Sequence, residues 1–118
     1  MSCGKVFKSV GLVARYDKKS VLKLTEDLAA YLKKRGLKVY VEETLTDKVT
    51  TKEEFIPLSK MKADFIITIG GDGTILRTCL NIPKPEPPIL TINMGVRGFL
   101  TEVEPKNACE AVDRILKG

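Results

Sequence analysis

The chain has 118 residues, a length typical of one domain, and its 43% hydrophobic content is enough for one buried core. Charged residues make up 30% of the sequence, alongside nine glycines and six prolines, which excludes collagen-like, low-complexity and broadly disordered proteins. Because the sequence contains no histidine, histidine-based zinc sites, Ser-His-Asp triads and imidazole acid-base catalysis are excluded as well.

The sequence favours a cytoplasmic protein. No apolar run is long enough to span a membrane, and the first residues lack the apolar core of a signal peptide. The three cysteines, Cys3, Cys79 and Cys109, are odd in number and far apart, which does not fit a disulfide framework. We therefore expect free thiols, a cytoplasmic location and no membrane partner.

The net charge of +5 does not by itself predict a nucleic-acid partner. Basic and acidic residues are interleaved, and the densest basic cluster, at residues 33–35, fits the C-terminal end of a helix. A solvated surface is favoured over a nucleic-acid patch, so we expect no nucleic-acid partner.

The first part of the chain predicts a strand, a helix and a second strand. Residues 6–14 form an apolar run typical of a buried strand, and residues 37–41 predict the next strand. Between them a helix is predicted, with Asp17 or Ser20 as its cap and Gly36 as its stop. The apolar residues at helical spacing in this segment are Val21, Leu24, Leu28 and Leu32.

The middle of the chain is less regular until a strongly apolar segment begins. Residues 44–58 predict a loop with a weak helix. Residues 64–69 form a continuous apolar run, typical of a parallel strand that is buried on both faces. A helix is predicted from Gly73, and the proline-rich residues 82–88 then predict a rigid loop.

The last part of the chain predicts a strand at residues 89–92, a glycine-containing turn at residues 93–98 and a final helix from Pro105. The apolar stripe of that helix comprises Ala108, Ala111, Val112, Ile115 and Leu116. Strands and helices that alternate along the whole chain predict an α/β domain with a parallel sheet. Ligands are then expected at the carboxyl ends of the strands.

The most distinctive motif is Gly-Gly-Asp-Gly-Thr at residues 70–74, between the most apolar strand and a helix. Glycines let the backbone approach a ligand, and the N-terminus of a helix attracts phosphate. The motif is not a P-loop, because no lysine follows the last glycine. It also departs from the dinucleotide fingerprint, because Leu76 stands where a third glycine is expected.

Asp72 in the middle of this loop would repel a phosphate unless it had a chemical role. It could organise Mg²⁺, or it could accept a proton from an attacking hydroxyl, and both roles fit phosphoryl transfer. From the five residues alone, a tight turn with Asp72 as the N-cap of the helix is equally consistent.

The segment GGDGTILR at residues 70–77, followed by PILTINMGVRGFLTEVEP at residues 88–105, resembles NAD kinases. The first motif is also similar to the loop of diacylglycerol and sphingosine kinases, and phosphofructokinases have a near relative. Lipid kinases usually continue with an Asn-Glu pair, whereas this chain has Leu76 and Arg77 there. The second segment matches the NAD kinase pattern at Asn93, Gly95, Gly98, Phe99, Leu100 and Thr101.

The resemblance implies a Rossmann-like, three-layer α/β domain, similar to the N-terminal domain of NAD kinases and phosphofructokinase-like kinases. It implies transfer of a phosphoryl group from ATP or polyphosphate to the 2′-hydroxyl of the adenosine ribose of NAD, which gives NADP. Mg²⁺ or another divalent cation is the implied cofactor. Small-molecule nucleotides are the implied partners, and the full-length enzyme is expected to be a homo-oligomer.

The resemblance also implies roles for individual residues. Asp72 would be the catalytic proton acceptor, Leu76 and Phe99 would line the adenine pocket, and Arg77 would be a cationic ligand contact. Without the family, Arg77 also fits a surface arginine, Phe99 a core aromatic residue and Asn93 a loop cap. The full set of implied ligand-binding positions is Gly71, Gly73, Thr74, Leu76, Arg77, Asn93, Gly95 and Phe99.

NAD kinases continue into a second, largely β domain that holds much of the NAD site, and no similar segment occurs in this sequence. We therefore expect residues 1–118 to be an N-terminal nucleotide- and phosphate-binding domain, from which the C-terminal β domain is absent, and to be inactive in isolation. Two alternatives remain at this point: a lipid or small-alcohol kinase with the same loop, and a non-catalytic nucleotide-binding regulatory domain.

Overall fold

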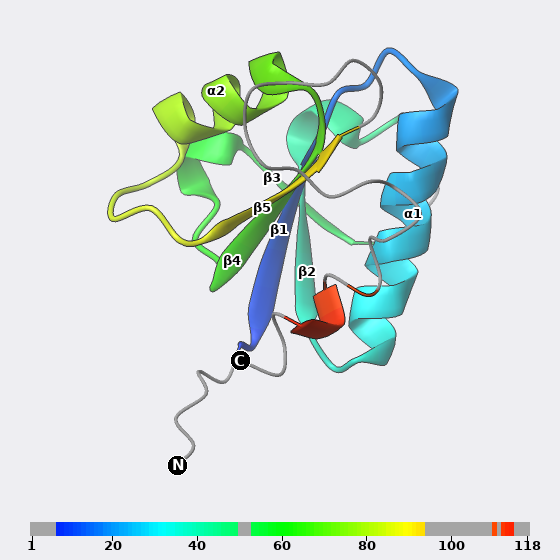
Figure 1. Ribbon diagram of the computed structural model, residues 1–118, viewed down its shortest axis with the longest axis horizontal. Helices are drawn as coiled ribbons and strands as arrows, with labels where there is room; N and C mark the ends of the chain where they lie inside the picture. The colour runs from blue at the N-terminus through cyan, green and yellow to red at the C-terminus, as the bar shows by residue number, and fades with distance from the viewer. Residues whose placement is uncertain (1–6, 50–52, 94–109, 111, 115–118) are drawn as a thin grey trace.

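The computed structural model describes residues 7–49, 53–93, 110 and 112–114, with Asp72 and Asn93 described by their backbone alone. The elements alternate along the chain (Figure 1). In chain order they are β1 (Ser9–Ala14), α1 (Lys19–Lys34), β2 (Lys38–Glu42), the 3₁₀ helix η1 (Glu43–Leu45), β3 (Glu54–Ile56), the 3₁₀ helix η2 (Leu58–Lys60), β4 (Phe65–Gly70), α2 (Asp72–Asn81) and β5 (Ile89–Asn93). No helix in the described part of the chain is long and apolar enough to cross a membrane.

The strands form one parallel sheet in the order β3-β2-β1-β4-β5. From β1 the chain builds outward to β2 and β3, and then returns to place β4 on the other side of β1 and β5 beyond it. The predicted α/β class and parallel sheet are confirmed. The pairing of β1 with β4 marks the point at which the strand order reverses, where sheets of this type bind ligands.

The sheet has one strand more than the sequence predicted. Residues 54–56 were expected to lie in a loop with a weak helix, and this prediction was wrong, because β3 pairs with β2 from Tyr40↔Glu54 to Glu42↔Ile56. A strand of three residues at a sheet edge is too short to show a period-two pattern, so its position depends on backbone pairing with β2. The flanking residues form only the short helices η1 and η2.

Apolar side chains cover both faces of the sheet and give the domain three layers. On one face, Leu12 of β1 and Ile67 of β4 belong to a cluster with Leu28 and Leu32 of α1. On the other face, Ile66 of β4 packs in a second cluster with the apolar side chains of Leu58, Met61 and Ile82, which come from η2 and the residues that follow η2 and α2. All six residues of β4 are buried, as its unbroken apolar run predicted.

Part of the predicted last helix lies on the α1 side of the sheet. Residues 110 and 112–114 are helical, and Val112 is fully buried in the α1 cluster. The Tyr31 hydroxyl donates a hydrogen bond of 2.5 Å to Asp113, and Arg35 donates one of 2.8 Å to the same carboxylate. The start of this helix and the turn predicted at residues 93–98 lie outside the described residues, except for the backbone of Asn93.

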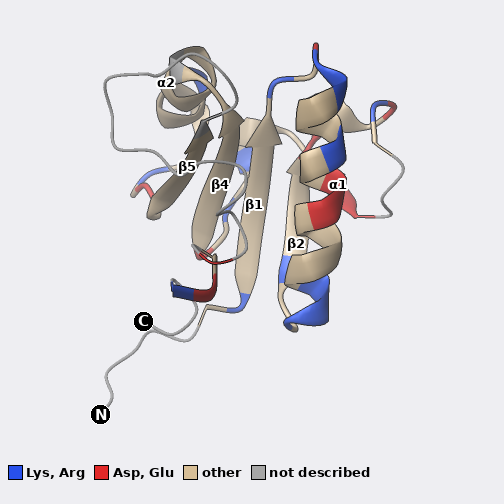
Figure 2. Ribbon diagram, turned by 45° about the vertical axis from the view of Figure 1, so that its right-hand side comes forward, with Lys and Arg blue, Asp and Glu red and all other residues tan. Residues whose placement is uncertain are grey.

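Charged residues lie mainly on α1 and in the loops, whereas β1 and β4 contain none (Figure 2). The basic cluster predicted at a helix end is confirmed, because Lys33 and Lys34 lie in the last turn of α1. Lys33 forms an ion pair of 3.4 Å with Glu53, and Arg35 pairs with Asp113 at 2.8 Å. Two of these cations are therefore used within the domain.

The sequence prediction was wrong for the N-terminal end of α1 and correct for its C-terminal end. Its N-cap is Lys18, without a side-chain hydrogen bond, so the predicted caps Asp17 and Ser20 are wrong; the Asp17 carboxylate is held by Arg15 instead. At the other end Gly36 has a φ of 86°, and its N–H donates to the Lys33 carbonyl at 2.9 Å. The predicted glycine stop is confirmed.

We expect Gly36→Ala to lower the free energy of unfolding by about 1 kcal/mol, because an L-residue in this left-handed conformation is strained. No atom of residues 7–49, 53–93, 110 or 112–114 lies within 4 Å of a Cβ added at Gly36, so the strain is expected to come from the backbone rather than from crowding. Urea denaturation monitored by circular dichroism measures the effect. Gly36→Asn is the control, since asparagine tolerates a positive φ, and equal stability of the alanine and asparagine variants would contradict this explanation.

Candidate functional site

An open cleft of about 470 Å³ lies at the carboxyl ends of β1 and β4. One side comes from the loop after β1, and the other comes from Gly71 and the first two turns of α2. The cleft is therefore at the point where the strand order reverses, as the general rule for parallel sheets requires. Its lining residues are Arg15, Tyr16, Asp17, Gly71, Gly73, Thr74 and Arg77.

The first glycine of the motif is required by the fold. Gly70 ends β4 with a φ of 156°, and a Cβ added there would lie 2.6 Å from the Thr74 hydroxyl oxygen. Thr74 is buried, and its N–H donates to the Gly71 carbonyl at 3.1 Å in the first turn of α2. The strand and the helix therefore meet so closely that only a glycine fits at position 70.

The next two glycines have no such packing constraint. Among the described residues, a Cβ added at Gly71 or at Gly73 would meet nothing within 4 Å, and neither residue has a positive φ. Both line the cleft at the start of α2, where the first backbone N–H groups of a helix have no acceptor within the helix. These positions leave the helix N-terminus open to a ligand.

Asp72 and Asn93 both lie at this edge of the sheet. The backbone of Asp72 is the first residue of α2, after Gly71 as N-cap, so the alternative in which Asp72 caps the helix is wrong. Asn93 ends β5 and is paired in register with Gly70. The side chains of both residues, together with the predicted positions Gly95 and Phe99, lie outside the described residues.

Thr74 and Arg77 both line the cleft, whereas Leu76 is 61% exposed and is not among the lining residues. The Arg77 guanidinium also donates a hydrogen bond to the buried carboxylate of Glu42, at the end of β2. No sequence pattern connects Glu42 with this site. The roles implied for these residues toward a ligand stay predictions.

The loop after β1 supplies cleft residues that the sequence analysis did not identify. Arg15 binds Asp17 through two hydrogen bonds of 2.8 Å, and Tyr16, which lies between them in the sequence, is 54% exposed. The hydrogen bonds from Arg15 lower the pKa of Asp17 to about 2. The sequence signal that could have found these residues is that they directly follow the predicted first strand. Assigning them to the cleft also required the strand order, which places that strand beside β4.

Comparison with known proteins identifies the domain. Residues 10–118 match the family model of the ATP-NAD kinase N-terminal domain. The chain belongs to the NAD kinase family. A curated NAD kinase from Pyrococcus abyssi is 49% identical over 92% of this chain, and one from Methanothermobacter thermautotrophicus is 44% identical over the same share.

Two solved structures share the fold of this member of the NAD kinase family. Yeast NADH kinase complexed with NADH has a TM-score of 0.80 at 18% identity, over 96% of this chain and 39% of that one. An NAD kinase from Archaeoglobus fulgidus in complex with ATP has a TM-score of 0.63 at 26% identity, over 92% and 37% of the two chains. The chain also spans only 39% of the length of the two curated relatives above.

We expect Arg15→Ala to raise the pKa of Asp17 from about 2 towards its usual value, because hydrogen bonds from Arg15 are the largest cause of the lowered pKa. NMR titration of the Asp17 carboxyl carbon measures the change. The stability that this ion pair contributes is present above the pKa of the unfolded carboxyl and is lost as the pH falls through about 2.

Arg35→Ala is the control for this titration, because Arg35 pairs with Asp113 rather than with a residue of the cleft. It should leave the pKa of Asp17 unchanged. An Asp17 pKa that stays at about 2 in Arg15→Ala would show that the ion pair is not its cause.

Proposed function

We propose that this chain is the N-terminal domain of an NAD kinase that transfers a phosphoryl group from ATP or polyphosphate to NAD. The acceptor is the 2′-hydroxyl of the adenosine ribose, and the product is NADP. The observation that carries the proposal is the open start of α2, where Gly71 and Gly73 line the cleft although packing against the described residues does not require glycine at either position. Backbone at such a helix N-terminus can approach a phosphate closely and bind it.

The charge of the cleft supports the binding of a polyphosphate chain. Arg15 and Arg77 reach it from different elements, and the positive end of the α2 dipole lies at the same edge. Arginine guanidinium groups and helix N-termini both stabilise phosphate oxygens. We propose that the phosphates of the donor bind between these groups and the glycine loop, beside Thr74.

We propose that Asp72 accepts the proton of the attacking 2′-hydroxyl. The hydroxyl oxygen then forms a bond to the terminal phosphorus of the donor, and the bond from that phosphorus to the bridging oxygen breaks. The position of the Asp72 backbone at the first residue of α2, on the cleft edge, supports this role. Positioning and charge neutralisation supply most of the catalysis in such reactions, and one proton acceptor completes it.

The acceptor half of the site is proposed to lie mainly in a C-terminal β domain. The relatives named NAD kinase are longer, since this chain covers 39% of each. We propose that Leu76 and Phe99 line the adenine pocket, that Asn93 and Gly95 contact the nucleotide, and that the 118-residue chain alone binds nucleotide without turnover. Correct positioning of both substrates is worth roughly 7 to 11 kcal/mol of barrier, which one wall of a cleft does not supply.

We further propose that the full-length enzyme is a cytoplasmic homo-oligomer. Leu80 of α2 is 71% exposed, which supports a covering surface in the complete protein. The three unmatched cysteines of the sequence support a reducing compartment.

Mg²⁺ or another divalent cation belongs to the proposal as a companion of the nucleotide. Among the described residues, no three acidic or cysteine side chains are grouped so that they could hold a metal ion. Asp17 lines the cleft, but its two carboxylate oxygens accept hydrogen bonds from Arg15. These residues do not fit a metal site made by protein alone, so we propose that the cation is held by donor phosphates and water.

Gly73→Ala provides the first test of the phosphate site. Its Cβ would meet no atom of the described residues within 4 Å, and alanine favours a helix by up to about 1 kcal/mol over glycine, so we expect equal or higher stability. The added methyl group should obstruct the phosphates and weaken ATP binding at least about tenfold, a loss of ~1.4 kcal/mol. Isothermal titration calorimetry and thermal denaturation of the 118-residue chain measure the two effects.

Gly70→Ala is the matched control, because its Cβ would overlap the Thr74 side chain. It should lower the free energy of unfolding by about 1 to 3 kcal/mol, the usual cost of overpacking. If Gly73→Ala bound ATP as tightly as the unaltered chain, the glycine loop would not be the phosphate site.

The second test is Asp72→Asn in the full-length protein. The amide keeps the shape of the side chain but does not accept a proton, so kcat should fall by about 100- to 10,000-fold with ATP affinity retained. A coupled assay of NADP formation measures turnover. Unchanged kcat and KM would contradict the proton-acceptor role, and a shifted dependence on divalent cation would instead assign Asp72 to metal binding.

A further inference from the structure

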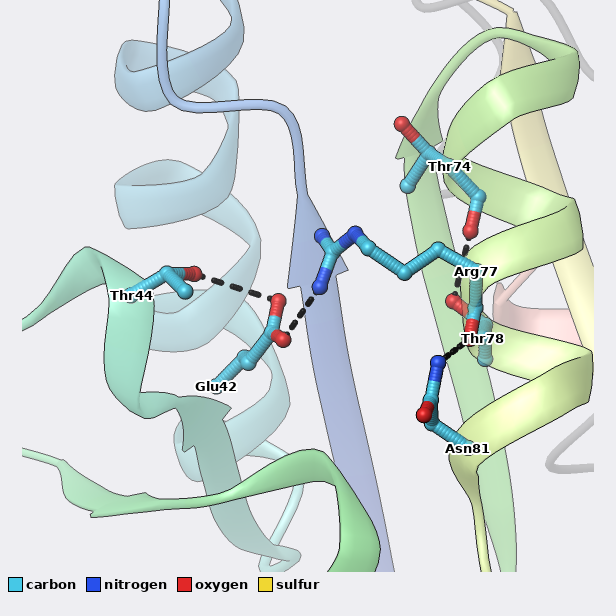
Figure 3. A network of polar contacts seen from close by, with 6 residues as sticks. All are labelled: Glu42, Thr44, Thr74, Arg77, Thr78 and Asn81. Atoms are coloured by element: carbon cyan, nitrogen blue, oxygen red, sulfur yellow. Dashed lines mark hydrogen bonds and ion pairs between the residues drawn. The ribbon is translucent and has the colours of Figure 1, made fainter.

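Glu42 is a buried carboxylate close to the cleft that the proposed reaction does not use. It ends β2, and its side chain is 5% exposed. One carboxylate oxygen accepts a hydrogen bond of 3.1 Å from the Thr44 hydroxyl, and the other accepts one from the Arg77 guanidinium (Figure 3). Burying a carboxylate is costly unless it is paired and hydrogen-bonded, and both of its oxygens are satisfied in this way.

The pair joins parts of the fold that are not neighbours in the sheet. Glu42 belongs to β2 and Arg77 to α2, which follows β4, and β1 lies between β2 and β4. The Arg77 side chain extends from α2 across the end of β1 to reach the carboxylate (Figure 3). Its guanidinium is thereby held by a residue of β2, and Arg77 also lines the cleft.

Fixing the guanidinium at one nitrogen leaves donors for a ligand. Arginine has five N–H donors in a planar fork, and the hydrogen bond to Glu42 uses Nη1. Within the described part of the chain, Nε and Nη2 of Arg77 donate to no protein group. A long side chain that is already held in place loses less conformational freedom when it binds a phosphate.

We propose that Glu42 is a positioning residue, which holds the Arg77 guanidinium in the cleft so that its remaining N–H groups bind phosphate oxygens of the nucleotide. The inference rests on the proposed function, since it requires that phosphates occupy this cleft. It adds a residue of β2 to a site that otherwise comes from the loop after β1 and from Gly71 and α2.

If Glu42 positions Arg77, removing the Glu42 carboxylate should change the affinity for a polyanion in the direction opposite to that expected from charge alone. Removing the Glu42 carboxylate makes the surroundings of the cleft more positive by one charge, which by Coulomb attraction would strengthen the binding of a polyanion. If Glu42 positions Arg77, the same change releases the guanidinium and weakens binding. The direction of the change in affinity therefore separates the two explanations.

The experiment measures binding of inorganic triphosphate to the 118-residue chain by isothermal titration calorimetry. We expect Glu42→Ala and Arg77→Ala each to weaken binding about tenfold, and the double variant to bind no more weakly than Arg77→Ala alone. This non-additivity is expected only if Glu42 acts through Arg77. Glu42→Gln keeps the shape of the side chain and one acceptor oxygen, so its triphosphate affinity should lie between those of the unaltered chain and Glu42→Ala. If Glu42→Ala does not fold, Glu42→Gln replaces it in the comparison of single and double variants.

Glu53→Gln is the matched control. The Glu53 side chain is also 5% exposed and also pairs with a cation, Lys33, but it does not line the cleft. It should leave triphosphate affinity unchanged, and thermal denaturation of every variant separates loss of binding from loss of fold.

Three outcomes would overturn the proposal. Tighter or unchanged triphosphate binding in both Glu42 variants would show that the Glu42 carboxylate does not position Arg77 for phosphate binding. Additive losses in the double variant would mean that Glu42 acts independently of Arg77. Absence of triphosphate binding to the unaltered chain would overturn the proposed phosphate site itself, and the inference with it, which distinguishes that failure from the other two.

Discussion

The parallel pairing of β1 with β4 brings together the two segments that make the cleft. Five residues of each strand are in register, from Val10↔Phe65 to Ala14↔Ile69, and both strands are buried between helical layers. Because parallel strands end at the same edge, the loop after β1 and the start of α2 meet there, although more than fifty residues of chain separate them. The cleft is a consequence of strand order rather than of either loop alone.

The glycines of the motif at residues 70–74 are subject to different structural constraints. Gly70 is needed for the close contact between β4 and the Thr74 side chain, so it belongs to the packing of the domain. Gly71 and Gly73 have no neighbour among the described residues that a Cβ would meet, so their small size leaves room for what enters from outside. A sequence motif of this kind therefore combines a requirement of folding with a requirement of binding.

Local patterns in the sequence predicted the features that depend on local chemistry. The apolar run of β4, the stop of α1 at Gly36 and the glycine loop before α2 could all be identified in this way. Strand order is set by contacts between distant segments, so Arg15 and Tyr16 could not be assigned to the cleft. Glu42 was missed for the same reason, because its partner Arg77 comes from an element on the far side of β1.

The short edge strand β3 affects how the sheet meets other molecules. An exposed sheet edge presents unpaired backbone groups on which a foreign strand can add, and long, flat, apolar edges promote aggregation. Here the edge is three residues long, begins with Glu54 in an ion pair of 3.3 Å with Lys38, and is followed directly by Pro57, which has no N–H to donate. On this side the sheet offers little backbone to a foreign strand, which protects the domain from edge-to-edge association while it is being synthesised and folded.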